Sequence, residues 1–496
     1  MTRTFVSSFI FLLILSLPAS LNGQRQTLTL SDAIEIAQAR SYGAIVARLN
    51  LMSRYWSHRS YRAELLPSIN LSGGLMEFDR SMVQTRDYED GQIYYVENNT
   101  LSNSLSLSID QNIAPLGGKL SVQSYIHRLD QFSYGNRLYN SRPIRLSYTQ
   151  PLFAYNRLKW LKKTEPLKYD VAKRTYLEAM EGIGVDVVGL FFGVLAAQSD
   201  LRQAESNLSD RRSLLETSGK RFELGTITKS ELLQLELSVL NAEVEAADNT
   251  LSLRNALFSL LSYLRLPADT DVTLIPPYTV TDILMSEADV TERALANSSH
   301  SLQQKVSILE SEQSVAQAKG NRGLQMQLHT QLGLDKSGTS LKDAYTGMRD
   351  NEIVGLTFSL PIFDWGMGRG RVKMAEADLE ANRVQLQQEH EKYLQDLATD
   401  VQSFNIQAVQ CKNALRAQDI ANERYDITKR RFEAGAVSVT DLNTAWQESE
   451  SARAQYIRLL RSYWSTYYSI RRSTLYDWVN GRDIAADFET IVNSSK

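Results

Sequence analysis

The sequence contains almost no cysteine and little proline, and neither charge sign predominates. A single cysteine in 496 residues, Cys411, rules out an intrachain disulfide and a multi-cysteine zinc site. Only 10 prolines leave room for long uninterrupted helices. The 54 lysines and arginines against 57 acidic residues give a net charge of −3, without the basic excess expected of a nucleic-acid-binding protein.

Motifs that would indicate catalysis are also missing. The five histidines are scattered without ligand spacing, so the sequence predicts no metal site. We find no Ser/His/Asp arrangement, no paired carboxylates and no phosphate-binding loop. We therefore expect no enzyme and no cofactor.

A sustained apolar run occurs near the N-terminus, from Phe9 to Leu17, after the basic residue Arg3. This pattern predicts a secretory signal peptide over residues 1–23, cleaved after Gly23. The run is shorter than the roughly 20 apolar residues that a membrane-spanning helix needs, and no later segment reads as such a helix. If the exported protein lies in a membrane, the sequence requires it to do so as a β-barrel.

The chain contains an internal repeat. The segment 221–225 reads RFELG and the segment 431–435 reads RFEAG, so the two copies lie 210 residues apart. The elements Pro151-Leu152-Phe153 and Pro361-Ile362-Phe363 keep the same spacing. A repeat of this length predicts one structural unit built twice. We assign the first copy to residues 24–280, the second to 281–476 and a C-terminal tail to 477–496.

Short segments with a period of two precede each Pro-aliphatic-Phe element and predict β-strands. They are centred on residues 69–75, 105–126 (a hairpin turning at Gly117-Gly118), 144–149, 326–332 and 354–358. The tyrosine-rich segment 78–101 is expected to be a loop. Each strand pairs an apolar face with a Ser/Thr/Gln face, which fits either a soluble sandwich or barrel, or the strands of a transmembrane barrel.

Helical periodicity dominates the rest. Apolar residues from Met180 to Leu208 alternate in steps of three and four, a coiled-coil seam in a helix of about 90 Å. A glycine ends each long helix, and a return helix follows; in the first copy this helix carries Leu233, Leu237, Leu240, Val244, Ala247 and Leu251. Capping boxes are predicted at Thr228–Glu231, Ser438–Asp441 and Ser286–Asp289, and an N-cap at Ser31.

The duplicated order of strands, long helix, tip and return helix resembles the TolC-like outer-membrane efflux proteins. The resemblance rests on the QPLF and LPIF strand ends and on two tips of the form [R][FY]xxG…[TS][DE][LV], and it covers essentially the whole chain after residue 27. It implies an internally duplicated α+β membrane protein. In such a protein, a homotrimer closes a β-barrel in outer-membrane lipid, continuous with a long periplasmic coiled-coil α-barrel.

The same resemblance implies a passive exit channel of a tripartite efflux pump, for drugs or heavy metals, or of a type I secretion system. A periplasmic adaptor (membrane fusion protein) and an inner-membrane RND or ABC transporter would open it by docking. A secreted or periplasmic coiled-coil scaffold without a pore is the alternative. Family members usually contribute four strands per protomer, so the hairpin at 105–126 is extra. We expect it to form an external loop rather than to join the barrel.

Several residues take functional roles by this resemblance. The adaptor is expected to contact the tips, at Arg221, Phe222, Glu223, Gly225, Arg431, Phe432, Glu433 and Gly435. The glycines and phenylalanines have a purely structural interpretation as well, in forming and packing the turns. Asp441 matches an acidic position that narrows the periplasmic entrance, and Thr444 falls where a second aspartate can occur. Thr228, Glu231 and Ser438 are assigned to capping, which is also the alternative role for Asp441.

Overall fold

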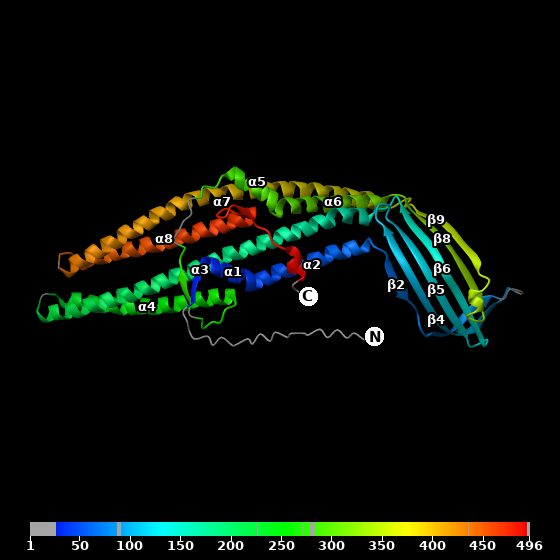
Figure 1. Cartoon of the computed structure of the whole chain (residues 1–496), viewed down its shortest axis with the longest axis horizontal. Coiled ribbons are helices and arrows are strands. Elements are labelled where there is room, and N and C mark those ends of the chain that lie inside the picture. The colour runs from blue at the N-terminus through cyan, green and yellow to red at the C-terminus, as the bar shows by residue number, and fades with distance from the viewer. Residues whose placement is uncertain are drawn as a thin grey trace, which may run out of the picture. The chain divides into compact units, whose positions relative to one another are not determined.

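The computed structural model describes residues 26–86, 91–225, 227–270, 272–277, 283–434 and 436–493. The expected signal peptide, residues 1–23, lies outside these ranges. The chain divides into two compact units. Figure 1 labels the helices and strands that make them up. We call residues up to 44, 182–282 and 406–468 the tip unit, and residues 45–181, 283–405 and 469–496 the sheet unit.

The tip unit is built from helices that carry the two tips. Its elements are β1 (Gln26–Thr29), α1 (Leu30–Arg40), the second part of α3 (Arg157–Glu223), α4 (Lys229–Leu264), β7 (Val272–Ile275), the second part of α7 (Met367–Glu433) and most of α8 (Val439–Thr474). Strands β1 and β7 pair in parallel, and α1 packs on α4. The predicted long helices are therefore present, and each is followed by its return helix.

The expected coiled-coil seams are only partly buried within the tip unit. Val187 and Val194 of α3 are fully buried, as expected. In the N-terminal half of α4, the buried residues are Leu232, Leu235, Val239 and Ala242. The apolar stripe read from the sequence is exposed, at Leu233, Leu237, Leu240, Val244 and Leu251. A heptad stripe of α4 is therefore left uncovered in the single chain.

The sheet unit contains an antiparallel sheet flanked in sequence by helices. Its elements are α2 (Tyr42–Glu64), which begins in the tip unit, β2 (Ser68–Ser72), β3 (Glu77–Arg86), β4 (Ile93–Ile113), β5 (Gly118–Gln131), β6 (Asn136–Leu152), the first part of α3, α5 (Glu287–Asn297), α6 (His300–Arg322), β8 (Gln325–Gly338), the 3₁₀ turn η1 (Asp343–Tyr345), β9 (Arg349–Ser359), the first part of α7, the end of α8, β10 (Tyr476–Asp477), β11 (Arg482–Asp483) and α9 (Phe488–Asn493). The strand order is β2–β4–β5–β6–β8–β9, and β3 pairs with β4 beyond the end of β2.

Two expectations about this sheet are wrong. Residues 78–101 do not form a loop, because β3 and the first half of β4 pair over ten residues. Side chains on both faces of β3 are exposed, so no alternation of apolar and polar residues marks it as a strand. The hairpin at 105–126 is not an external loop either. It forms part of β4 and β5, which lie in the middle of the sheet between β2 and β6.

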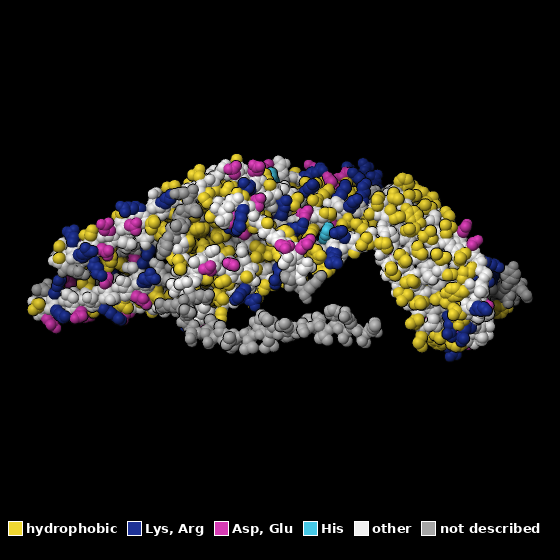
Figure 2. Space-filling view, viewed as in Figure 1, with side chains coloured by type: hydrophobic (Ala, Val, Ile, Leu, Met, Phe, Trp, Pro, Cys, Tyr) yellow, Lys and Arg dark blue, Asp and Glu magenta, His cyan; other side chains and the backbone are white. Residues whose placement is uncertain are grey.

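The two faces of the sheet differ in character. On one face, an apolar row crosses five strands through Ile69, Ile109, Val122, Leu146 and Leu332, whose partners are in register. All five side chains are exposed, from 36% for Val122 to 71% for Ile69. Figure 2 shows hydrophobic side chains gathered over the sheet. The opposite face carries the polar row Ser68, Asp110, Ser121, Ser147 and Gln331.

Helix caps agree with the sequence at the tips but differ elsewhere. The N-cap of α1 is Thr29 rather than Ser31, and Thr29 forms a capping box with Asp32. Ser286 does precede α5, but its side chain makes no capping hydrogen bond. The expected box at 286–289 is therefore wrong, although Asp289 still places a negative charge in the first turn.

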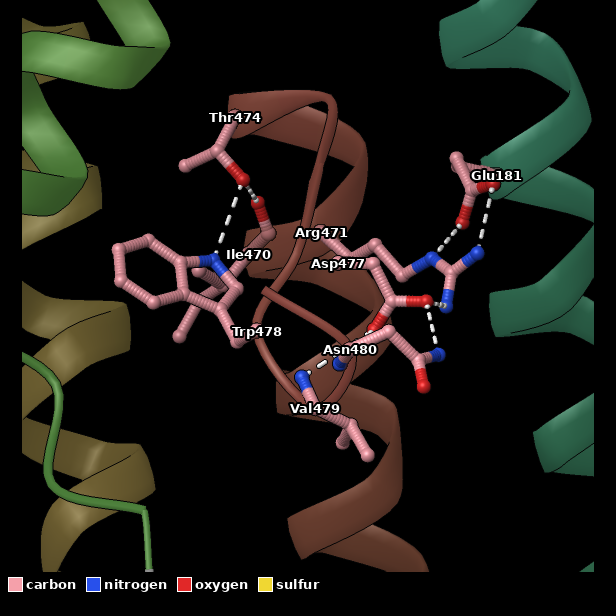
Figure 3. Close-up of polar contacts among 8 residues, drawn as sticks. All are labelled: Glu181, Ile470, Arg471, Thr474, Asp477, Trp478, Val479 and Asn480. Atoms are coloured by element: carbon pink, nitrogen blue, oxygen red, sulfur yellow. Dashed lines mark hydrogen bonds and ion pairs between the residues drawn. The ribbon is translucent and has the colours of Figure 1, made fainter. Parts of the chain in front are cut away.

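Buried ion pairs connect the segment after α8 to α3 and to the end of α8 (Figure 3). Arg471 lies between two carboxylates, with Nε 2.6 Å from Oε2 of Glu181 and Nη1 3.0 Å from Oδ2 of Asp477. Each carboxylate side chain is only 4% exposed. The amides of Val479 and Asn480 donate to Oδ1 of Asp477. This part of the expected tail is thus an ordered component of the unit.

One helix among the described residues, α3, is long and apolar enough to cross a membrane by length and composition alone. The sequence analysis identified no membrane-spanning helix after the signal, and length and composition alone do not make α3 one. Phe191 and Val188 of this helix are fully buried in the protein. A packed interior position accounts for their apolar character equally well.

Candidate functional site

The first tip is a tight turn between α3 and α4. Gly225 has a φ of +75°, a conformation that glycine adopts at little cost, and its amide donates to the carbonyl of Phe222 at 2.9 Å. Phe222 is 37% exposed and has the ammonium group of Lys229 5.7 Å from its ring centre. Arg221 and Glu223 are exposed as well. The turn therefore presents an aromatic ring and charges of both signs to solvent.

A capping box fixes the start of α4. The Thr228 amide donates to Oε2 of Glu231 at 2.7 Å, and the Glu231 amide donates to the Thr228 hydroxyl at 3.3 Å. Two hydrogen bonds lower the pKa of Glu231: the bond from the Thr228 amide has the larger effect and the bond from the Thr228 hydroxyl the smaller. The carboxylate is therefore charged where the helix dipole favours a negative charge.

The second tip repeats this chemistry between α7 and α8. The Ser438 amide and hydroxyl donate to Oδ2 of Asp441 at 3.0 and 2.7 Å, and the Asp441 amide donates back to the hydroxyl. Arg431 is exposed, whereas Phe432 is half-buried. Gly435 lies outside the described residues. The two phenylalanines thus differ in exposure although their motifs match.

Asp441 and Thr444 lie one turn apart near the start of α8, and both are exposed. Hydrogen bonds from Ser438, side chain first and backbone second, lower the pKa of Asp441, and the charge of Arg431 adds to the effect. Thr444 donates its hydroxyl to the carbonyl of Thr440. Asp441 therefore stays exposed to solvent while it caps α8. An exposed carboxylate is what the expected entrance role requires, so one residue can serve both roles.

Polar contacts tie the two tips together inside the tip unit. Asp210 of α3 accepts a hydrogen bond from the Tyr425 hydroxyl at 3.0 Å and pairs with the Lys429 ammonium at 2.9 Å. Burial, together with the charge of Asp210, raises the pKa of Tyr425. Arg211 donates to Oδ1 of Asn443 at 3.3 Å. These bonds link the end of the first long helix to both helices of the second tip.

A cavity of about 350 Å³ lies beside these contacts. Its lining includes Arg221 and Phe432, two of the residues expected to contact a partner, together with Leu442 and Trp446. The guanidinium of Arg211 lies 5.9 Å from the Trp446 ring centre. The structure thus brings residues of both tips to one half-apolar hollow, and that hollow includes Phe432 but not Phe222.

An acidic cluster lies on the same helices. Burial raises the pKa of Glu450 to about 7. The positive charge of Arg453 opposes this rise, and the negative charges of Asp200 and Glu245 add to it. Arg453 pairs with Glu450 and donates to Oε1 of Gln203 at 3.0 Å. Three helices, α3, α4 and α8, supply these groups.

Sequence reasoning missed the cross-tip contacts and the acidic cluster. Asp210 and Tyr425 lie 215 residues apart, and neither belongs to a recognisable motif. The one sequence signal for this contact is the constant spacing between the two repeats, which puts Asp210 and Tyr425 at similar distances from their respective tips. Within the described residues, no group of three or more His, Cys, Asp or Glu side chains could hold a metal ion.

Comparisons with known proteins agree with this arrangement. The outer membrane efflux protein family matches residues 33–264 and 290–474, which are two segments, one in each repeat. No curated protein sequence matches the chain. Among solved structures, the CmeC outer membrane channel of Campylobacter jejuni gives a TM-score of 0.66 at 14% identity, covering 94% of this chain and 88% of that one.

Two further channels have the same fold. The outer membrane protein VceC of Vibrio cholerae gives a TM-score of 0.64 at 15% identity, with 92% of this chain and 97% of that chain covered. The open state of the MtrE outer membrane channel of Neisseria gonorrhoeae gives a TM-score of 0.58 at 14% identity, with 92% of this chain and 91% of that chain covered. The duplicated TolC-like fold expected from the sequence is confirmed, and the chain belongs to the outer membrane efflux protein family.

Proposed function

We propose that the protein is the outer-membrane exit channel of a tripartite efflux pump or a type I secretion system. Three copies close a β-barrel in the outer membrane, and their helices form the periplasmic conduit. The observation that carries this proposal is the exposed apolar row on the sheet, because an aqueous surface does not favour such a band. A lipid-facing strand surface requires it. The polar opposite face suits a water-filled lumen.

The exposed stripe on α4 supports assembly of several copies. Leu233, Leu237, Leu240 and Val244 are 50–62% exposed and follow coiled-coil spacing. On α7, Val409, Ile420 and Ile427 are exposed by 49–59%. Helical stripes of this kind are stable in water when another helix covers them. We propose that α4 of one copy packs against a neighbouring copy, closing a ring of helices.

The tips supply the surface for opening the channel. Phe222 and Leu224 are exposed, by 37% and 78%, and the exposed charges of Arg221 and Glu223 flank them in the sequence. Exposed apolar side chains beside charged ones suit docking of a periplasmic adaptor. The adaptor and an inner-membrane RND or ABC transporter supply the energy. The chain itself is a passive conduit and not an enzyme.

Cell fractionation with bilayer recording tests this function. The channel is expected in the outer membrane, to need detergent for extraction, and to give discrete conductance steps in planar bilayers. The alternative, a periplasmic or secreted scaffold without a pore, predicts release by osmotic shock and no conductance. Either of those two results would reject the channel.

A further inference from the structure

We propose that the hairpin formed by β4 and β5 widens the exit pore. With this hairpin, each protomer contributes six strands side by side to the barrel wall, where β2 and β3 together count as one strand position. This inference rests on the channel function proposed above. In the described residues, β2, β4, β5, β6, β8 and β9 are hydrogen-bonded in one continuous order. β3 continues the position of β2, since both pair with successive stretches of β4.

The apolar row shows that the hairpin shares the environment of its neighbours. Ile109 of β4 pairs with Ile69 of β2, Val122 of β5 pairs with Leu146 of β6, and Ile109 pairs with Val122. The exposed band therefore runs through the hairpin without a break. An external loop would have no reason to continue that band in register with the flanking strands.

The polar face is continuous as well. Asp110 of β4 accepts a hydrogen bond from the Asn70 amide of β2 at 3.1 Å and pairs with Lys119 of β5 at 3.4 Å. The Gln123 amide donates to the Ser106 hydroxyl at 2.6 Å. A polar lining of this kind suits the wall of a water-filled lumen.

Both outer edges of the sheet need a partner of matching direction. Lipid cannot satisfy the backbone groups along β9 and along β2 with β3. Neighbouring strands alternate in direction throughout, so with six positions β9 runs antiparallel to β2 of the next copy. The occupant of each edge is therefore a second copy of this chain, and three copies supply eighteen strands.

The strand number sets the bore. Barrel diameter grows roughly linearly with the number of strands, and barrels of 16–18 strands hold an aqueous channel. Removing β4 and β5 would leave β2 antiparallel to β6, which gives four positions per copy. The six-position wall is therefore about 1.5-fold wider than the wall that the same sheet would make without the hairpin.

Electron cryomicroscopy of the full-length protein in lipid nanodiscs tests the strand number directly. We expect a closed barrel with six strand positions per copy, including β4 and β5. A closed barrel with four positions per copy and the hairpin outside it would overturn this inference and leave the channel function standing. A particle without a closed barrel would overturn both.

A matched pair of arginine substitutions tests the environment of the hairpin. Leu107 lies on the exposed apolar face, and the next residue, Ser108, lies on the polar face. Leu107→Arg is expected to abolish membrane insertion, since a charge on the lipid-facing side is strongly disfavoured, whereas Ser108→Arg keeps it. Insertion is read from the heat-resistant oligomer on gels. Equal membrane insertion of both variants would place the hairpin outside the lipid and contradict the proposal.

Deleting residues 82–133, which contain β4 and β5, provides the converse test. The deletion joins Ser81 to Tyr134-Gly135, so that a glycine with positive φ remains to form the turn. A folded variant should show a barrel about 1.5-fold narrower than the wild type in the same images. An unchanged diameter would contradict the inference, and the arginine pair decides the question if the variant does not fold.

Discussion

At the scale of single residues, the tail is held by a charge arrangement that depends on one arginine. Arg471 faces Glu181 and Asp477, and both carboxylates are almost completely buried. Burial raises the pKa of Glu181, and the Arg471 charge opposes that rise. The guanidinium therefore keeps two interior acids compatible with folding at neutral pH.

Replacing Arg471 by alanine is expected to destabilise the protein by roughly 3 kcal/mol, because it leaves buried carboxylates without their partner. Urea unfolding in detergent, followed by tryptophan fluorescence, gives the free energy. Arg424→Ala is the control, since its pair with Glu448 has exposed side chains and is worth less than about 1 kcal/mol. Similar losses for the two variants would show that the Arg471 pair is no stronger than a surface pair.

Glu450 makes the stability of the tip unit depend on pH. Burial raises its pKa to about 7 from an ordinary 4.5, so the folded chain disfavours the ionised form. The contribution of Glu450 to stability is therefore fully present below pH 4.5 and is lost as the pH rises through about 7. We expect Glu450→Gln to reduce this decline by roughly 1 kcal/mol, after allowance for solvent screening of a half-buried group.

The measurement compares urea unfolding at pH 5 and pH 8 for the wild type and Glu450→Gln. Asp200→Asn is a second variant, and removing this neighbouring negative charge should shift the transition to lower pH. A pH profile of Glu450→Gln that superimposes on that of the wild type would show that Glu450 is not the titrating group.

At the scale of elements, capping fixes where the return helices begin. Thr228→Ala removes a side-chain acceptor at the start of α4 and is expected to cost about 1 kcal/mol. Hydrogen exchange at the amides of the first turn of α4 should speed up accordingly. Ser286→Ala is the matched control, because that N-cap makes no side-chain bond and α5 should be less affected. A larger effect at Ser286 than at Thr228 would contradict the assignment.

The sequence predicts these elements well wherever one face is apolar and the other is polar. The long helices, the tips and the strands around Leu107 and Leu146 follow directly from periodicity. β3 could not be predicted, because side chains on both of its faces are exposed. For α4, the apolar stripe at Leu237 was visible, but periodicity does not say whether the covering helix belongs to the same chain. The contact of Asp210 with Tyr425 was hidden by sequence distance alone.

At the scale of the whole molecule, the exposed stripe of α4 is expected to control assembly. Leu237→Lys, combined with Leu240→Lys, places two charges in the proposed contact between copies and should convert the oligomer to monomer. Size-exclusion chromatography with light scattering in detergent measures the mass. Gln234→Lys, at an exposed position on the flank of α4, should leave the oligomer intact. Retention of the oligomer in the double variant would rule out this contact.

We also propose an entrance role for Asp441 in the assembled channel, where the carboxylates of several protomers would form one ring. Asp441→Ala is expected to raise single-channel conductance or to alter block by cations in planar bilayers. Glu231→Ala is the matched control, because it removes the same capping interaction at the first tip. Equal currents through wild type and Asp441→Ala, or the same change in both variants, would assign Asp441 to capping alone.

The pairing of β1 with β7 has a consequence for biogenesis. β1 stands at the start of the first repeat and β7 at its end, and α1 packs on α4 between them in sequence. The two ends of the first repeat are therefore closed on each other within that repeat, without a strand from the second repeat. If the chain is exported N-terminus first, as the channel function proposed above requires, this closure does not have to wait for the second repeat to arrive.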